Sequence, residues 1–222
     1  MSDKPTVTLG YWSIRGLAEP LRCLLHHCNV KFNDVTYACG DAPGFDLSDW
    51  FNVKHKLGLP FPNLPYLIDE ATGLKMTQSD AILRHIGREH NLVGSTPLEK
   101  AEVDMLVDLA KDIAMGLTRV VYNPKFSELI GDLSTKTAPA WLQLLSDHLG
   151  SKEWFAGSLS IADFVLYERL DVLNHLIPGS VDAHANLKAF MTRFEALPRV
   201  AEFVASAEHK SLKFNNKMAV WQ

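Results

Sequence analysis

The pattern of hydrophobic and polar positions differs between the two parts of this chain, and the boundary between them falls near residue 91. Before it, residues 6–9 and 31–37 are short runs of the kind that form strands. Between them, apolar residues recur at helical spacing and predict one helix face, which consists of Leu17, Leu21, Leu24, Leu25 and Cys28. Pro20 is compatible with that helix only in its first turn.

A second pair of strands is predicted at residues 66–69 and 74–77, which flank a turn containing Thr72-Gly73. Residues 79–90 return to a helical pattern. A strand, crossover helix and strand normally give a right-handed parallel pair, whereas a short glycine-containing turn joins antiparallel strands. The order βαβ, a short irregular helical piece, then ββα therefore predicts a small mixed sheet.

From residue 97 onward the strand signals vanish, and one long helix is predicted. Thr96 and Glu99 form a capping box, Pro97 suits the first turn, and Asn123-Pro124 would end the helix. We interpret its apolar stripe as core rather than as a cofactor site; the stripe consists of Val103, Leu106, Val107, Ala110, Ile113, Ala114, Leu117 and Val121.

Further helices are predicted at about residues 139–149, 160–176, 186–197 and 199–207. The second of these opens with the capping box Ser160-Ile-Ala-Asp163. The chain is therefore expected to comprise an α/β domain (residues 1–90), a linker (residues 91–96) and an all-helical domain (residues 97–222).

Composition narrows the class of protein. A length of 222 residues with 47% hydrophobic and 22% charged content allows a substantial core. The net charge of -4 is spread along the chain, which argues against a nucleic-acid partner. The first five residues carry an acid and no long apolar run follows, so we expect a cytoplasmic protein without a secretory signal or membrane span.

The cysteines and histidines predict neither a disulfide framework nor a metal site. Three cysteines clustered near one end, Cys23, Cys28 and Cys39, suit reduced thiols, and the first two lie among leucines as small apolar residues would. His85 and His90 are five residues apart, a helical spacing that does not aim both at one metal ion. The sequence also contains no nucleotide-binding or serine-hydrolase motif.

Candidate chemistry begins at Tyr11 and Trp12, which place a phenol hydroxyl and an indole donor side by side at a predicted strand end. Such donors can stabilise a thiolate and a carboxylate. The proline-bracketed turn at residues 61–66 and the polar helix start at residues 77–82 are typical of a site that holds a small peptide.

Together these segments resemble cytosolic glutathione transferases of the mu class over essentially the whole chain. Residues 40–43 lie in an insertion characteristic of that class. The motifs that carry the resemblance occur in the family's order and spacing: Leu9-Gly-Tyr-Trp12, Ile14-Arg-Gly-Leu17, Gly40-Asp-Ala-Pro43, Lys56-Leu-Gly-Leu59, Phe61 to Tyr66, Thr77-Gln-Ser79, Tyr122-Asn-Pro124, Trp154-Phe-Ala-Gly157 and Lys217-Met-Ala-Val-Trp221.

The resemblance implies a thioredoxin-like first domain, a helical second domain and a homodimer. It also implies an enzyme that conjugates the thiolate of reduced glutathione to hydrophobic electrophiles in detoxication, with glutathione as co-substrate and no other cofactor. The thiol of free glutathione, near pKa 8.5, is mostly protonated at neutral pH. The resemblance assigns Tyr11 the catalytic role of donating a hydrogen bond to the sulfur, which lowers the thiol pKa; a tyrosine packed on the core is the alternative.

The resemblance also assigns the rest of the glutathione site. Trp12, Trp50 and Lys54 would hold the glycine carboxylate, with Asn63 in the same polar wall; core aromatics and a solvated lysine are the alternative. Pro65 matches a proline preceded by a cis peptide bond, which would turn the backbone of Leu64 toward the ligand's cysteine; an ordinary trans proline is the alternative.

Gln78 and Ser79 would bind the γ-glutamyl carboxylate at a helix start, where free N–H groups and the positive dipole end favour an anion. Capping by Ser79 alone is the other interpretation. Asp112 matches an acid that reaches the γ-glutamyl ammonium from the partner subunit. For the dimer, Phe61 matches an aromatic key inserted between partner helices, and Arg84 a charged residue near the two-fold axis; both could instead be ordinary surface residues.

The second pocket would take the electrophile. Leu17, Met115 and Tyr122 match its lining, and Phe214 and Asn215 lie at the tail positions that complete it. Tyr122 has a second catalytic role in the resemblance, because its hydroxyl could hydrogen-bond to an oxygen that gains charge in the reaction. Core packing of the first two residues, and a helix-end role for Tyr122, are the alternatives.

Two positions depart from the family pattern. Leu47 stands where an arginine of the glycine-carboxylate site is common, which predicts weaker glutathione binding. Asn215 stands where an aromatic pocket residue is common, with Phe214 one position earlier, so the preferred electrophile is open.

Two other functions are compatible with this fold: a non-catalytic binding protein for haem, steroid-like or other apolar anions, and a structural protein. The enzyme is favoured over a structural protein, because a protein that kept only the fold would not need the polar residues of the glutathione site. This chain has all five of those considered: Tyr11, Trp12, Lys54, Gln78 and Ser79.

Overall fold

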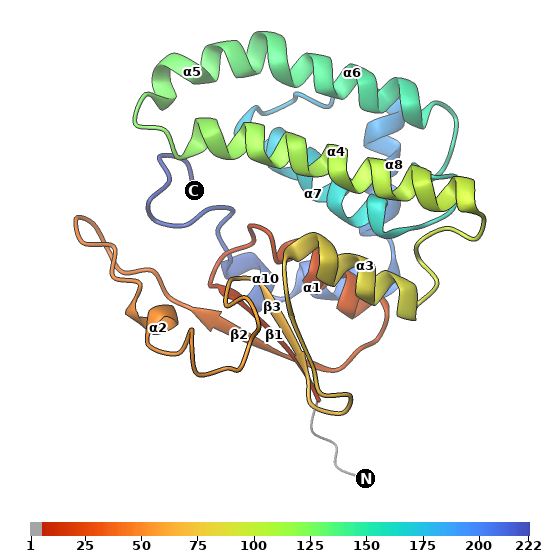
Figure 1. Ribbon diagram of the computed structural model, residues 1–222. Coiled ribbons are helices and arrows are strands. Elements are labelled where there is room, and N and C mark those ends of the chain that lie inside the picture. Colours follow the sequence, from red (N-terminus) through yellow and green to blue (C-terminus); the bar gives the residue numbers. More distant parts are fainter. Residues whose placement is uncertain (1–5) are drawn as a thin grey trace.

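A four-stranded mixed sheet forms the first part of the structure, a computed structural model that describes residues 6–222 (Figure 1). Its strands are β1 (Val7–Trp12), β2 (Phe32–Tyr37), β3 (Tyr66–Asp69) and β4 (Leu74–Thr77), in the order β2-β1-β3-β4. β1 and β2 are parallel, whereas β3 is antiparallel to both of its neighbours. The mixed sheet predicted from the alternating pattern is therefore confirmed.

β1 continues three residues beyond its predicted end at residue 9. Gly10 pairs with Tyr66 of β3, and a Cβ at position 10 would lie 2.1 Å from the Tyr66 ring, so only glycine leaves room for that ring against β1. The longer strand carries Tyr11 and Trp12 into the sheet.

Three helices accompany the sheet: α1 (Glu19–His27), α2 (Ser48–Phe51) and α3 (Ser79–Glu89). Pro20 lies in the first turn of α1, as predicted. The predicted face of this helix is partly wrong, because Leu17 precedes the helix and is 44% exposed, and Cys28 follows its last residue. Leu17 therefore points away from the core that Leu21, Leu24 and Leu25 enter.

The second part of the chain is helical. Its long first helix, α4 (Pro97–Val121), begins with the predicted capping box of Thr96 and Glu99. The helices that follow are α5 (Phe126–Asp132), α6 (Ala138–Leu149), α7 (Ile161–Leu176), α8 (Ala185–Glu195), α9 (Pro198–Ala205) and α10 (Ala207–Ser211), with a π-helical turn, Leu133–Thr137, between α5 and α6.

Two short helices, α5 and α10, and the π-helical turn were not predicted. Neither α5 nor α10 contains a buried residue, so no apolar stripe marks them in the sequence. The longer helices, which do bury a face, lie close to their predicted ranges.

Helix α7 forms the centre of the molecule. Every residue from 161 to 173 is buried, because α7 packs against α4 on one side and against α1, α3 and α8 on others (Figure 1). The sheet and its helices end before residue 91 and the helical part begins at Pro97, as the proposed division into residues 1–90, 91–96 and 97–222 requires. That division stays a prediction.

Three further expectations concern the N-terminus, membrane-spanning helices and the cysteines. Residues 1–5, which carry the expectation about the N-terminus, lie outside the described range. No helix in residues 6–222 is both long and apolar enough to cross a bilayer. Cys23, Cys28 and Cys39 are all free thiols.

Candidate functional site

Three strand ends converge at one edge of the sheet. Gly10 pairs with Tyr66, and Tyr66 pairs with Thr77. One step farther along each strand, the same edge therefore brings Tyr11, Pro65 and Gln78 close together.

The hydroxyl of Tyr11 is buried and accepts a hydrogen bond from the backbone N–H of Leu17 at 3.2 Å. Gly16 makes this approach possible, because its φ of +45° suits glycine and an added Cβ would lie 2.8 Å from the hydroxyl oxygen. Burial raises the pKa of Tyr11, although the hydrogen bond from Leu17 opposes the rise. Tyr11 is therefore a neutral phenol at physiological pH, and accepting from Leu17 leaves its proton free to donate.

A cavity of about 520 Å³ opens beside this hydroxyl, between the sheet domain and the helices α4 and α7. Eight of the predicted site residues line it: Tyr11, Leu17, Gln78, Ser79, Met115, Tyr122, Phe214 and Asn215. Leu17 and Met115 are 44% and 43% exposed, which is the behaviour expected of pocket lining and not of core.

The C-terminal tail reaches this cavity by pairing with the loop after β1. The N–H groups of Arg15 and Gly16 donate to the carbonyls of Lys213 and Phe214, at 2.8 and 3.2 Å. Phe214 stacks on Trp221, and the Arg15 guanidinium lies 4.2 Å from the centre of the Phe214 ring. The tail is thus held as a cavity wall.

Tyr122, the C-cap residue of α4, also lines the cavity. Its hydroxyl accepts a hydrogen bond from the backbone N–H of Asn216 at 3.0 Å, and burial raises the pKa of its phenol. Like Tyr11, it keeps a proton available for donation.

Ser79 does not cap the helix that starts at Gln78 and Ser79, so the capping alternative is not observed. Gln78 is the N-cap of α3, and no side chain caps this helix; the Ser79 hydroxyl instead lies 3.2 Å from a carboxylate oxygen of Asp80. Gln78 has φ +76°, which is costly for a residue with a side chain. The first N–H groups of α3 therefore lack a side-chain acceptor and belong to residues that line the cavity.

The other predicted glutathione ligands are absent from the cavity lining. Pro65 follows a cis peptide bond, as predicted, and the N–H of Leu64 donates to the side chain of Asn63 at 2.9 Å. Trp50 is only 3% exposed and stacks on Tyr66, which is the core arrangement considered as its alternative.

Trp12 and Lys54 are half-buried, and the Lys54 ammonium lies 5.3 Å from the ring of Phe51. Leu47, at the missing arginine position, is the N-cap residue of α2. The roles assigned to the glycine-carboxylate residues remain predictions.

Of the three residues assigned to the dimer or to the partner's glutathione site, two are exposed and Arg84 is half-buried. Phe61 is 77% exposed and Asp112 is exposed on α4. Arg84 is held in place by Asp104 and Asp108 of α4, at 2.6 and 2.7 Å.

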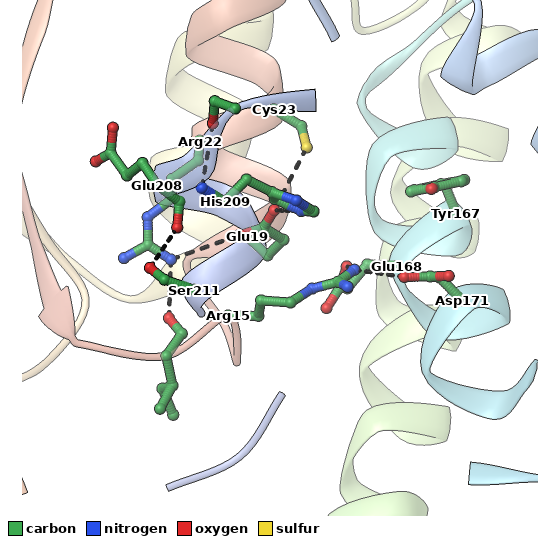
Figure 2. Close-up of polar contacts among 12 residues, drawn as sticks. Arg15, Glu19, Arg22, Cys23, Tyr167, Glu168, Asp171, Glu208, His209 and Ser211 are labelled. Atoms are coloured by element: carbon green, nitrogen blue, oxygen red, sulfur yellow. Dashed lines mark hydrogen bonds and ion pairs between the residues drawn. The ribbon is translucent and has the colours of Figure 1, made fainter. Parts of the chain in front are cut away.

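A buried polar cluster joins the loop after β1 to α7 (Figure 2). Arg15 reaches from the loop after β1 to Glu168 and Asp171 of α7, at 2.5 and 2.6 Å. In the part of the chain that the structure covers, no group of three or more His, Cys, Asp or Glu side chains is placed to bind a metal ion.

Arg169 is a cavity residue that the sequence did not reveal. It occurs in the middle of the α7 pattern, where an arginine is usually read as a solvent-facing position. The side chain of Arg169 is buried because α4 and α1 pack on α7, which the sequence pattern does not indicate.

Comparison with known proteins assigns both parts of the chain to one family. Residues 7–88 match the family described as "Glutathione S-transferase, N-terminal domain", and residues 111–207 match "Glutathione S-transferase, C-terminal domain". The chain is similar to Glutathione S-transferase Mu 5 of Rattus norvegicus, with 44% identity over 100% of this chain and 97% of that protein. It is similarly 44% identical to Glutathione S-transferase Mu 1 of Homo sapiens, over 96% and 97% of the two chains.

Solved structures agree with this result. The glutathione S-transferase Blo t 8 superposes with a TM-score of 0.86 and 33% identity, covering 96% of this chain and 98% of that one. The Pi-class glutathione S-transferase of Onchocerca volvulus has a TM-score of 0.85 and 29% identity, over 96% and 99% of the two chains. With its thioredoxin-like sheet domain, its helical domain and full-length mu-class relatives, this chain belongs to the glutathione S-transferase family and groups with the mu class.

Proposed function

We propose that the phenol of Tyr11 holds the sulfur of glutathione as a thiolate and that the cavity beside it receives the electrophile. The chain is a transferase that conjugates glutathione, and detoxication is the general role of its family. The observation that carries the proposal is the Tyr11 hydroxyl: it is buried, neutral and accepts from Leu17, and it borders the 520 Å³ cavity.

The cavity suits this chemistry. A donor fixed beside the sulfur stabilises the charged form of the thiol and so lowers the thiol pKa. The N–H groups at the start of α3 supply an anion site for the γ-glutamyl carboxylate next to it. Leu17 and Met115 offer an apolar surface to the electrophile, and Tyr122 a second phenol proton.

Further parts of the proposal rest on the family resemblance. We assign Trp12, Trp50, Lys54, Asn63, Leu64 and Pro65 to glutathione binding, Asp112 to the partner's site, and Phe61 and Arg84 to a homodimer. A cytoplasmic location and independence from any cofactor other than glutathione belong to the same proposal.

The test compares purified protein with its Tyr11→Phe variant, using glutathione and a chlorodinitrobenzene. We expect conjugation by the unaltered protein and a loss of about 100-fold or more in kcat/KM in the variant, because one preorganised donor to a developing anion is worth about that much. Ultraviolet titration of bound glutathione should show a thiol pKa below that of free glutathione, and a higher one in the variant.

Tyr37→Phe is the matched control. It removes a buried hydroxyl that bonds to Tyr66 at 2.8 Å, outside the cavity lining, and should leave the thiol pKa unchanged. Equal rates for Tyr11→Phe and the unaltered protein would remove Tyr11 from its role. Binding of apolar anions with no conjugation of any electrophile would favour the non-catalytic binding protein.

A further inference from the structure

One face of α7 forms part of the cavity wall. Val165, Glu168, Arg169 and Val172 all line the cavity, and their spacing of three, four and seven residues places them on the same side of the helix. Three of these residues leave no charge unpaired: Val165 and Val172 are apolar, and Glu168 pairs its carboxylate with Arg15 (Figure 2). The fourth, Arg169, is a cation that is only 8% exposed.

Among the described residues, the guanidinium of Arg169 has no counterion. Within residues 6–222, no carboxylate lies within 4.0 Å of it, and its side chain makes no hydrogen bond. The acids nearest to it in electrostatic terms already have partners, since Glu168 pairs with Arg15 at 2.5 Å and Asp80 pairs with Lys111 at 2.7 Å.

This isolation is unfavourable in the free protein. Burial lowers the pKa of Arg169, and the charge of Glu168 only partly opposes that effect, yet an arginine remains protonated in proteins. A buried charge without a partner carries a desolvation cost that an anion entering the cavity would relieve. The cavity lining also includes the aliphatic side chains of Leu17, Val107, Ala110 and Met115. Two other cations line it, but Lys111 pairs with Asp80 and Arg119 is exposed to solvent, so neither is a buried, unpaired charge.

We propose that Arg169 makes the enzyme select electrophiles that combine an apolar body with an anionic group such as a carboxylate. This inference rests on the proposed function and deepens it. The apolar body would lie on the aliphatic wall, the anion would pair with the Arg169 guanidinium, and the reacting carbon would face the sulfur beside Tyr11. Arg169 then determines specificity and takes no part in the bond changes: the thiolate attacks the carbon, and the leaving group departs with its electron pair.

The experiment uses two substrates of nearly the same shape, a chlorodinitrobenzene and a chlorodinitrobenzoate, with the full-length protein. The measured quantity is the ratio of kcat/KM for the benzoate to kcat/KM for the neutral compound. We expect Arg169→Met to lower this ratio by about tenfold or more, because a charge-assisted contact is lost, and Arg169→Lys to retain most of it. Arg199→Met, which removes an exposed arginine of α9, should leave the ratio unchanged.

Several results would overturn the proposal. One is an unchanged ratio in a folded Arg169→Met protein, as judged by thermal unfolding. Another is an equal loss for both substrates together with a higher thiol pKa of bound glutathione, which would place the effect of Arg169 on the sulfur.

A binding measurement separates this proposal from the transferase activity itself. Calorimetry with unreactive dinitrobenzoate and dinitrobenzene should show tighter binding of the benzoate, and Arg169→Met should abolish the difference. If the protein conjugates neither substrate, the proposed function fails, and the calorimetric difference still decides whether Arg169 selects anions. Equal binding of the two compounds would contradict the inference.

Discussion

At the scale of single residues, Glu19 is a buried charge that fixed partners stabilise, in contrast to Arg169. Glu19, 1% exposed, lies between His209 at 2.9 Å and Arg22 at 3.5 Å (Figure 2). Arg22 also pairs with Asp34 at 2.6 Å. Burial by itself would raise the pKa of Glu19, but the hydrogen bond from His209 and the charges of Arg15 and Arg22 outweigh it and leave the pKa below its ordinary value. Glu19 thus ties α10, and with it the tail that follows, to α1.

The first prediction concerns acid stability. Because the pKa of Glu19 is lower in the folded protein than its ordinary value of 4.5, its ionised form stabilises the fold fully above about pH 4.5. That contribution is lost as the pH falls through the lower, folded-state pKa. Glu19→Gln should therefore cost about 3 kcal/mol at pH 7 and progressively less below pH 4.5, which thermal unfolding between pH 7 and pH 3 will measure.

Glu202→Gln, an exposed change on α9, is the control for this series. A Glu19→Gln protein whose deficit stays constant down to pH 3 would contradict the assigned linkage.

A second prediction at this scale concerns Tyr122. Its phenol proton is free, because the hydroxyl accepts from the N–H of Asn216. Tyr122→Phe should lower kcat for epoxides or conjugate acceptors by about tenfold or more, since an oxygen gains charge in those reactions. Tyr122→Phe should lower kcat for the chlorodinitrobenzene much less. Equal losses of kcat with both substrate classes would show that Tyr122 does not donate its proton to such an oxygen.

At the scale of elements, two capping boxes differ in their surroundings. Asp163 at the start of α7 is fully buried, and accepts from the N–H groups of Ser160 and Phe155 at 2.8 and 2.9 Å. Glu99 in α4 makes the equivalent contacts to Ser95 and Thr96 on the exposed surface. The two motifs look alike in sequence, but only one of them satisfies N–H groups that water cannot reach.

The third prediction follows from this contrast. Asp163→Ala leaves two buried N–H groups without an acceptor and should lower the free energy of unfolding by about 3 kcal/mol or more. Glu99→Ala, its matched control, should cost about 1 kcal/mol or less. Urea denaturation of both variants will decide; comparable losses would show that burial does not distinguish the two caps.

At the scale of the whole molecule, the exposed ring of Phe61 is a feature that the single chain does not explain. It is 77% exposed, and the carbonyl of its backbone accepts a hydrogen bond from Thr77, which fixes the loop that presents it. A large aromatic side chain held in this way is suited to fill a pocket of a second copy.

The fourth prediction tests that role. If Phe61 anchors the proposed homodimer, Phe61→Ala should shift the protein toward monomer at micromolar concentration in analytical ultracentrifugation, because loss of a buried aromatic anchor weakens an interface. Phe51→Ala removes another exposed ring, 55% exposed on α2, and should leave the mass unchanged. A Phe61→Ala protein that stays dimeric would remove Phe61 from the interface.

The sequence alone determined the architecture. Strands β3 and β4, the capping boxes at Thr96 and Ser160, and the long helix α4 were all predictable, because the signals for them are local: periodicity, turn residues and caps. Motifs of the mu class then pointed to eight residues that the structure brings to one cavity.

The tertiary structure decided what depends on contacts between distant segments. The extension of β1 comes from pairing with β3, the exposure of Leu17 from the turn before α1, and the burial of the unpaired Arg169 from the packing of α1 and α4 on α7. None of these has a local signature, because burial and charge pairing are properties of the assembled fold: the same arginine would be an ordinary solvated residue on an isolated helix.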